Sequence, residues 1–297
     1  METVEVLLRK IQANDGALIG SVDRSLMARR NVGLIWAALI DQSAKDFDMR
    51  KRMDCLSAMR ALAKERLPLD DALENGELPF GMILARSPGL GALAVGDIPF
   101  DLNAVDREGR TPAQKCIALA ARAPMDYFEA MAKMAARPDW RISEKDQGAA
   151  VCFAVAGKLP YFASSAREGE ARALAWRIFE GLAEKGYDFN AAREAGDAKM
   201  GSAINTPLAY CVKRAARWSS ANRADKAVMG AVEAIVAMLI GRGADPGLQM
   251  EPGERVHLLE ACRRAGLGSG LAASLEAGIL GACIGDGAAA KPLRQRL

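Results

Sequence analysis

Residues 100–112 read FDLNAVDREGRTP, a stretch in which turn-forming residues come directly before a pair of residues that start helices. The early Asp and Asn residues favour tight turns, and Gly109 can take the positive φ that a hairpin needs. Thr111 can cap a following helix, and Pro112 suits the first helical position, where its missing N–H costs nothing. The stretch therefore predicts a hairpin followed by a helix that begins at Pro112.

The order and spacing of these residues resemble the loop pattern of the ankyrin-repeat family, D-x-N-A-x-D-x-x-G-x-T-P. The matching residues are Asp101, Asn103, Ala104, Asp106, Gly109, Thr111 and Pro112. The family repeats about every 33 residues, and Gly76 and Pro79 stand one such period before Gly109 and Pro112. The resemblance implies an all-α fold, an ankyrin-like α-solenoid of helix-turn-helix repeats with hairpin loops and helical caps.

Two later segments extend this pattern. Thr206 and Pro207 repeat the Thr-Pro step, and residues 232–246, VEAIVAMLIGRGADP, resemble the family's second helix and its turn. Only Thr3 lies outside the two Thr-Pro steps, a distribution that chance rarely produces. The spacing of the segments is uneven, so the resemblance implies lengthened helices and insertions. The implied insertions lie at 157–172, 191–205 and 217–228.

On this pattern the chain has four parts. They are an N-terminal helical capping region (1–67), ankyrin-like repeats (68–250), C-terminal capping helices (251–285) and a flexible tail (286–297). Caps are expected because an end repeat would otherwise expose its apolar face. Apolar spacing predicts helices over 2–13, 22–44 and 47–66, pairs over 79–95, 112–136, 148–186 and 207–242, and a closing pair over 254–284.

The composition favours a helical protein. Hydrophobic residues make up 51% of the 297 residues and aromatic residues only 5%, and the dominant Ala and Leu are strong helix formers. The net charge of +3 neither requires nor excludes a nucleic-acid partner. No apolar run approaches the roughly 20 residues of a membrane span, and the N-terminus lacks a signal-peptide core. We expect a cytoplasmic protein without a membrane partner, or one delivered into a host cell if it is an effector.

The cysteines are predicted to be buried, reduced thiols. There are six, and no two of them form a CxxC pair, which argues against a zinc site or a disulfide framework. Cys116 and Cys211 each follow a Thr-Pro proline by four residues, where the family carries a small buried Ala. Cys152 and Cys262 fit the same position, so all four resemble small hydrophobic residues of a helix seam.

No catalytic arrangement emerges from the sequence. His257 is the only histidine, and Cys262 does not share its helix face. The stretch GLGSG at 266–270 lacks the Lys-Ser/Thr of a phosphate loop. Turn geometry explains Asp101, Asp106 and Asp188 without acid–base chemistry. We therefore expect no enzyme activity, no cofactor and no metal, although a site within the insertions between 157 and 205 stays open as an alternative.

The resemblance implies a non-catalytic protein–protein interaction module, such as an adaptor, inhibitor or effector, that binds a partner protein on its concave and hairpin surface. The expected partner-binding residues are Asp106, Arg107, Arg110, Trp140, Arg141, Lys145, Lys213, Arg214, Arg217 and Trp218. Two placements of Trp140 stay open, a projecting hairpin tip or packing against an adjacent repeat. The Ala-rich composition and degenerate repeats favour a bacterial or phage source.

Basic zones at 24–66 and 213–226 leave a second function open. Each is rich in Lys and Arg, whereas residues 67–110 hold an excess of acids. Such zones can be ordinary solvated helix faces, or they can steer a charged partner. The alternative to protein binding is therefore binding of a nucleic acid or nucleotide through the basic zones, which predicts a steep dependence on salt.

Overall fold

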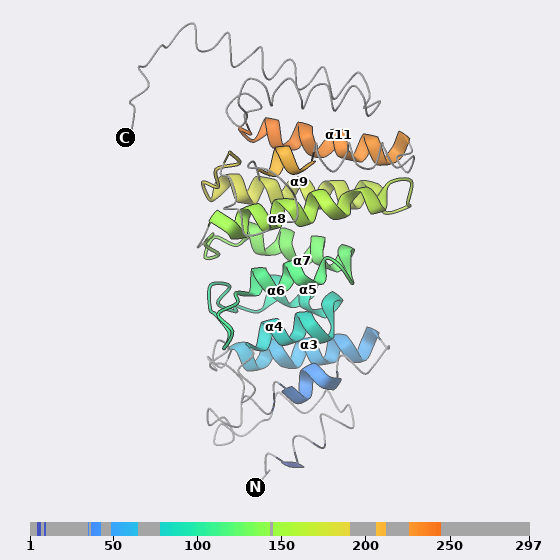
Figure 1. Ribbon diagram of the computed structural model, residues 1–297. Coiled ribbons are helices and arrows are strands. Elements are labelled where there is room, and N and C mark those ends of the chain that lie inside the picture. Colours follow the sequence, from blue (N-terminus) through green and yellow to red (C-terminus); the bar gives the residue numbers. More distant parts are fainter. Residues whose placement is uncertain are drawn as a thin grey trace, which may run out of the picture. The chain divides into compact units, whose positions relative to one another are not determined.

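The computed structural model describes residues 5, 6, 9, 35, 37–42, 49–64, 78–142, 145–190, 206–211 and 226–244. These residues form helices joined by turns, with no β-strand among them, which makes the described chain all-α as the sequence predicts (Figure 1). Contacts divide the chain into two compact units, residues 1–143 and 144–297. Each unit is described by itself.

In the first unit, proline sets the start of four successive helices. The elements are α3 (Met49–Lys64), α4 (Pro79–Arg86), α5 (Pro88–Asp97), α6 (Pro112–Leu119) and α7 (Pro124–Ala136). Proline at the first helical position has the φ of a helix and gives up an N–H that would have no partner there. The sequence therefore fixes where α4 to α7 begin.

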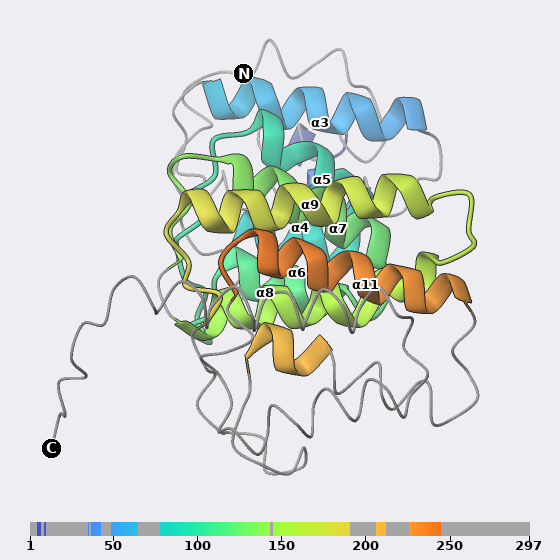
Figure 2. The same cartoon turned by 90° about the horizontal axis from the view of Figure 1, so that it is seen from above.

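The helices of this unit stack in two layers. α4 packs on α6 and α5 packs on α7, while each member of the pairs α4–α5 and α6–α7 packs on the other (Figures 1 and 2). α3 packs on α5 and so extends the second layer. Phe80 of α4 stacks on Phe100 with ring centroids 5.0 Å apart, and Phe128 of α7 is fully buried. Burial of these apolar faces between neighbouring helices supplies the core.

The second unit repeats the theme with longer helices. Its elements are α8 (Lys145–Lys158), the 3₁₀ turn η3 (Leu159–Phe162), α9 (Glu168–Glu184), a helical segment at 207–211 and α11 (Lys226–Gly241). α9 lies beside α11 (Figure 2), and η3 packs on both helices. At Gly148 of α8 an added Cβ would stand 2.2 Å from the ring of Tyr187, so only glycine lets this turn approach the helix.

The predicted helices lie where the described helices lie, but their ends and breaks differ. The pair over 79–95 breaks at Ser87, and the pair over 112–136 breaks at 120–123. The stretch 148–186 begins earlier, at Lys145, and is divided by η3 and a turn at 163–167. Of the expected N-terminal helices, the described residues 5, 6, 9, 35 and 37–42 are helical. The closing pair over 254–284, the tail and most of the insertions at 191–205 and 217–228 lie outside the described residues.

Candidate interaction surface

A tight hairpin precedes α6 at residues 105–110. The Asp106 N–H donates to the Arg110 carbonyl at 3.0 Å, and the Gly109 N–H donates to the Asp106 carbonyl at 2.9 Å. Gly109 has φ +73°, the left-handed conformation that the sequence predicts for it. No atom lies within 4 Å of the position its Cβ would take, so the glycine is required by backbone conformation alone.

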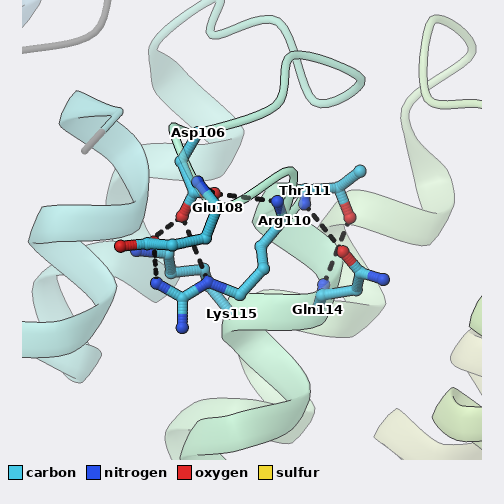
Figure 3. Close-up of polar contacts among 6 residues, drawn as sticks. All are labelled: Asp106, Glu108, Arg110, Thr111, Gln114 and Lys115. Carbon is cyan, nitrogen blue, oxygen red and sulfur yellow. Dashed lines mark hydrogen bonds and ion pairs between the residues drawn. The ribbon is translucent and has the colours of Figure 1, made fainter. Parts of the chain in front are cut away.

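The Asp106 carboxylate holds this hairpin together from inside. Its Oδ1 accepts the backbone N–H groups of Glu108 at 3.0 Å and Arg110 at 2.8 Å, and its Oδ2 accepts from Lys115 Nζ at 2.9 Å (Figure 3). Burial would raise the pKa of Asp106, but the hydrogen bond and charge of Lys115 and the Arg110 backbone N–H outweigh it and lower the pKa to about 2. A carboxylate that accepts several N–H groups beside a cation stays ionised.

Asp106 therefore does not offer its side chain to a partner, contrary to the prediction from the sequence. Only 5% of the residue is exposed. The reason is Lys115, which lies one turn into α6. Its side chain passes over Gly81 of α4 and binds the Asp106 carboxylate. The absence of a side chain at Gly81 leaves room for the lysine stem, whose Cδ is 3.4 Å from the position of a Cβ there.

The hairpin is joined to α6 by a reciprocal cap. The Thr111 hydroxyl accepts the Gln114 N–H at 3.3 Å, and the Gln114 side-chain oxygen accepts the Thr111 N–H at 2.9 Å (Figure 3). This capping box satisfies two backbone donors at the start of the helix. Thr206 makes one half of this arrangement at the next Thr-Pro helix, since its hydroxyl accepts the Ala209 N–H at 3.2 Å. The predicted helix starts at Pro112 and Pro207 are thus confirmed.

The outer side of the hairpin is exposed. Arg107, Glu108 and Arg110 are exposed, and Glu108 pairs with the Arg110 guanidinium. Val105 is 55% exposed and so places an aliphatic side chain at the surface. Val105 is not among the contact residues predicted from the sequence. Its exposure follows from its place in the sequence: Val105 and Arg107 flank Asp106, whose side chain points inward.

A second loop, residues 137–141, is fastened beside the first one. Asn103 makes the connection: its side-chain amide donates to the Asp139 carbonyl at 2.8 Å, and its side-chain oxygen accepts the Arg141 N–H at 2.7 Å. The Asn103 N–H in turn donates to the Asp101 carboxylate at 2.8 Å. One asparagine thereby fixes the backbone of both loops relative to each other.

Arg137 fastens the same loop to the end of α5. Its guanidinium donates to the Phe100 carbonyl at 2.7 Å and to the Ile98 carbonyl at 3.2 Å, and Nε donates to Asp139 at 2.9 Å. Trp140, which follows, is only 2% exposed. Of the two placements that the sequence left open, packing inside the unit is confirmed and the projecting tip is wrong. An indole buries a large apolar area, and the Arg137 contacts turn this loop toward the core.

The second unit carries the same Asp-x-Asn arrangement. The Asn190 N–H donates to the Asp188 carboxylate at 2.9 Å, and the Asn190 amide donates to the Gly243 carbonyl at 2.9 Å. Arg242, beside that glycine, stacks over the half-exposed ring of Trp176 at 4.6 Å from its centroid. The turn role predicted for Asp188 is confirmed, whereas the exposed Trp176 is not among the predicted residues.

Of the other predicted contact residues, only one has a described side chain. Arg141 is exposed at the second loop. Lys145 begins α8, and its side chain lies outside the described residues, as do the whole of Lys213, Arg214, Arg217 and Trp218. His257, Cys262 and the GLGSG stretch lie outside them too.

The four cysteines within the described residues agree with the prediction of buried thiols. Cys55, Cys116, Cys152 and Cys211 are buried and not disulfide-bonded. Burial raises the pKa of Cys116, and burial together with the charge of Cys211 raises the pKa of Cys152. Within the described part of the chain there is no group of three or more metal-ligating side chains. None of the helices described there is long and apolar enough to cross a bilayer.

No family model matches the chain, and no curated protein matches it.

Proposed function

We propose that this chain is an ankyrin-type repeat protein that binds another protein, without catalysis, through the hairpin at 105–110 and the loop at 137–141. The observation that carries the proposal is the construction of these loops. Asp106 and Asn103 turn inward and fix the backbone, while Val105, Arg107 and Arg141 turn outward.

The recurrence of local structure supports the repeat assignment. Pro79 and Pro112, about 33 residues apart as in the ankyrin period, both begin a helix of the first layer. Thr111 and Thr206 cap their helices through the same bond to the third residue onward. The Asp-x-Asn turn recurs at 101–103 and 188–190, with the asparagine amide bonded to a later loop each time. Stacking of first helices on first helices and second on second agrees with a repeat array.

Preorganised loops suit recognition of a protein. A loop that is already held in one conformation loses little entropy on binding, so more of the contact energy appears as affinity. Arginine is enriched at the energetic centres of protein interfaces, and an exposed aliphatic residue beside it supplies the apolar contact. The acids of the two loops already have structural partners: Asp106 bonds Lys115, Glu108 bonds Arg110 and Asp139 bonds Arg137.

Affinity purification from an extract of the source organism, followed by mass spectrometry, tests the proposal. Val105→Asp puts a charge at an exposed position of the hairpin. Ala121→Asp, the control, puts the same charge on the exposed turn between α6 and α7, at the end of α6 opposite to the hairpin. We expect a protein captured by the wild type and by Ala121→Asp to be lost with Val105→Asp. Equal capture by all three proteins would contradict the proposal, as would capture of nucleic acid alone.

A further inference from the structure

Two arginines of the proposed surface have no structural task. Arg110 bonds Asp106 and Glu108, and Arg137 bonds Asp139 and two carbonyl groups. Arg107 and Arg141 are exposed, and neither guanidinium has a hydrogen-bond or ion-pair partner in the described part of the chain. Their charges are therefore available to a binding partner.

The backbone that carries these two arginines is held rigidly. Arg107 stands between Asp106 and Glu108, in the turn closed by the Asp106 carboxylate. Arg141 is held by its own N–H, which donates to Asn103 at 2.7 Å. Because these bonds hold the backbone at both arginines, the two side chains start from fixed backbone positions, and less backbone freedom is lost when they bind.

The other exposed side chains narrow the chemistry of the partner. Glu108 and Asp139, whose side chains are 56% and 51% exposed, pair with Arg110 and Arg137. Arg107 and Arg141 are therefore separate cations rather than part of the continuous basic stripe that suits a phosphate backbone. Val105 is also exposed and offers an apolar contact that a phosphate backbone does not use. A protein segment with separate carboxylates and an aliphatic side chain fits all of these groups.

We infer that the surface binds an acidic segment of a partner protein, in which carboxylates pair with Arg107 and Arg141 and an aliphatic side chain packs on Val105. Arginine is suited to this role because its planar guanidinium donates two parallel hydrogen bonds to a carboxylate. The inference rests on the proposed function and specifies its partner.

Three labelled peptide pools test the inference, one combining Leu with Glu, one combining Leu with Gln and one combining Leu with Lys. Binding to the full chain is measured by fluorescence anisotropy. We expect the Glu/Leu pool to bind about tenfold more tightly than the Gln/Leu pool or better, and to weaken as salt is added. The double variant Arg107→Glu/Arg141→Glu should lose this binding and prefer the Lys/Leu pool.

Arg122→Glu is the matched control, because Arg122 is exposed on the α6–α7 turn at the far end of these helices. It should keep the Glu/Leu preference within about twofold, since surface charges beyond a Debye length are screened. Circular dichroism checks that all variants fold. Equal binding of the Gln/Leu pool, an equal effect of Arg122→Glu, or tighter binding of a single-stranded DNA oligonucleotide would overturn the inference.

The two failures can be told apart. If the Glu/Leu preference is absent while Val105→Asp still releases the captured native protein, the acidic partner is wrong and protein binding stands. If the peptide preference is present but no native protein is captured, the proposed function fails.

Discussion

Asp106 is the residue on which the hairpin depends, because its buried carboxylate meets two backbone N–H groups and Lys115 at once. Asp106→Asn removes the charge and leaves the Lys115 ammonium, whose side chain is 11% exposed, without its partner. Breaking a buried pair in this way costs about 3 kcal/mol. We expect that loss of unfolding free energy in urea. Asp106→Asn combined with Lys115→Met should recover part of it, and equal losses in the single and double variants would contradict this account.

The same carboxylate makes the free energy of unfolding depend on pH in the acid range. The folded pKa of about 2 lies below the usual value of an aspartate, which is about 3.9. The ionised group therefore stabilises the fold above about pH 4, and this contribution is lost as the pH falls from there toward about 2. Wild type should lose stability across this window more steeply than Asp106→Asn, as measured by chemical denaturation at each pH. Parallel pH profiles would refute the role of the ion pair.

Ser164 carries a backbone strain that a substitution can relieve. Its φ of 62° is a left-handed conformation that side chains with a Cβ disfavour. Ser164→Gly should raise the free energy of unfolding by about 0.5–1 kcal/mol. Ser165→Gly is the control, since the neighbouring residue has no positive φ and gains only chain entropy in the unfolded state. Stabilisation by both glycines, or by neither, would show that the strain is not the cause.

At the scale of elements, Asn103 joins two loops that are distant in the sequence. Asn103→Ala removes the bonds to the Asp139 carbonyl and the Arg141 N–H. Loss of such bonds costs about 1–2 kcal/mol together. We expect faster amide hydrogen exchange over 137–141 with little change in α6, whose Thr111 cap is untouched. Uniform acceleration across the first unit would mean that Asn103 supports the fold globally rather than the joint between the loops.

The close approach of Tyr187 to α8 gives a second prediction at this scale. Gly148→Ala would place a methyl group against the tyrosine ring, and overpacking of this kind costs about 1–3 kcal/mol. Gly169→Ala in α9 is the matched control, because nothing lies within 4 Å of its Cβ position. That variant should be neutral or slightly more stable, since alanine favours helix. Thermal denaturation separates the two, and equal effects would exclude the steric explanation.

Over the whole molecule, the proposed repeat organisation predicts a local response to damage, because each repeat would contact only its neighbours. The contacts group the chain into two units, so Asp106→Asn should increase amide exchange over 78–142 more than over 145–190. Gly148→Ala should do the reverse. Hydrogen exchange read by mass spectrometry measures both in one experiment. An equal increase over both ranges for each variant would show that the chain unfolds as one cooperative body.

The features that could be predicted from the sequence are those decided by local chemistry. Gly109, the Thr111 cap and the start of α6 at Pro112 all depend on residues within a few positions of one another. The helix pair predicted over 79–95 breaks at Ser87, and its second helix begins at Pro88. These are backbone preferences, which act before any tertiary contact forms.

The orientation of side chains in the loops could not be predicted in the same way. Trp140 is buried because Arg137 reaches carbonyl groups 37 and 39 residues earlier in the chain. Asp106 is buried because Lys115 fits over Gly81, a residue of the preceding helix pair. Such contacts depend on how helices stack, and no local pattern encodes them. The exposed Val105 follows from the same inward turn of Asp106 and was therefore missed.

The residues that maintain the two loops differ from those whose side chains are exposed, and this separation affects how binding specificity can change. Asp106, Gly109, Thr111 and Asn103 maintain the loops, and their bonds use no side chain at positions 105, 107 or 141. Mutations at those outer positions are therefore nearly free of any stability cost, and selection can alter them one at a time while the loops stay intact. A combinatorial library limited to Val105, Arg107 and Arg141 would start from a folded scaffold and sample new targets directly.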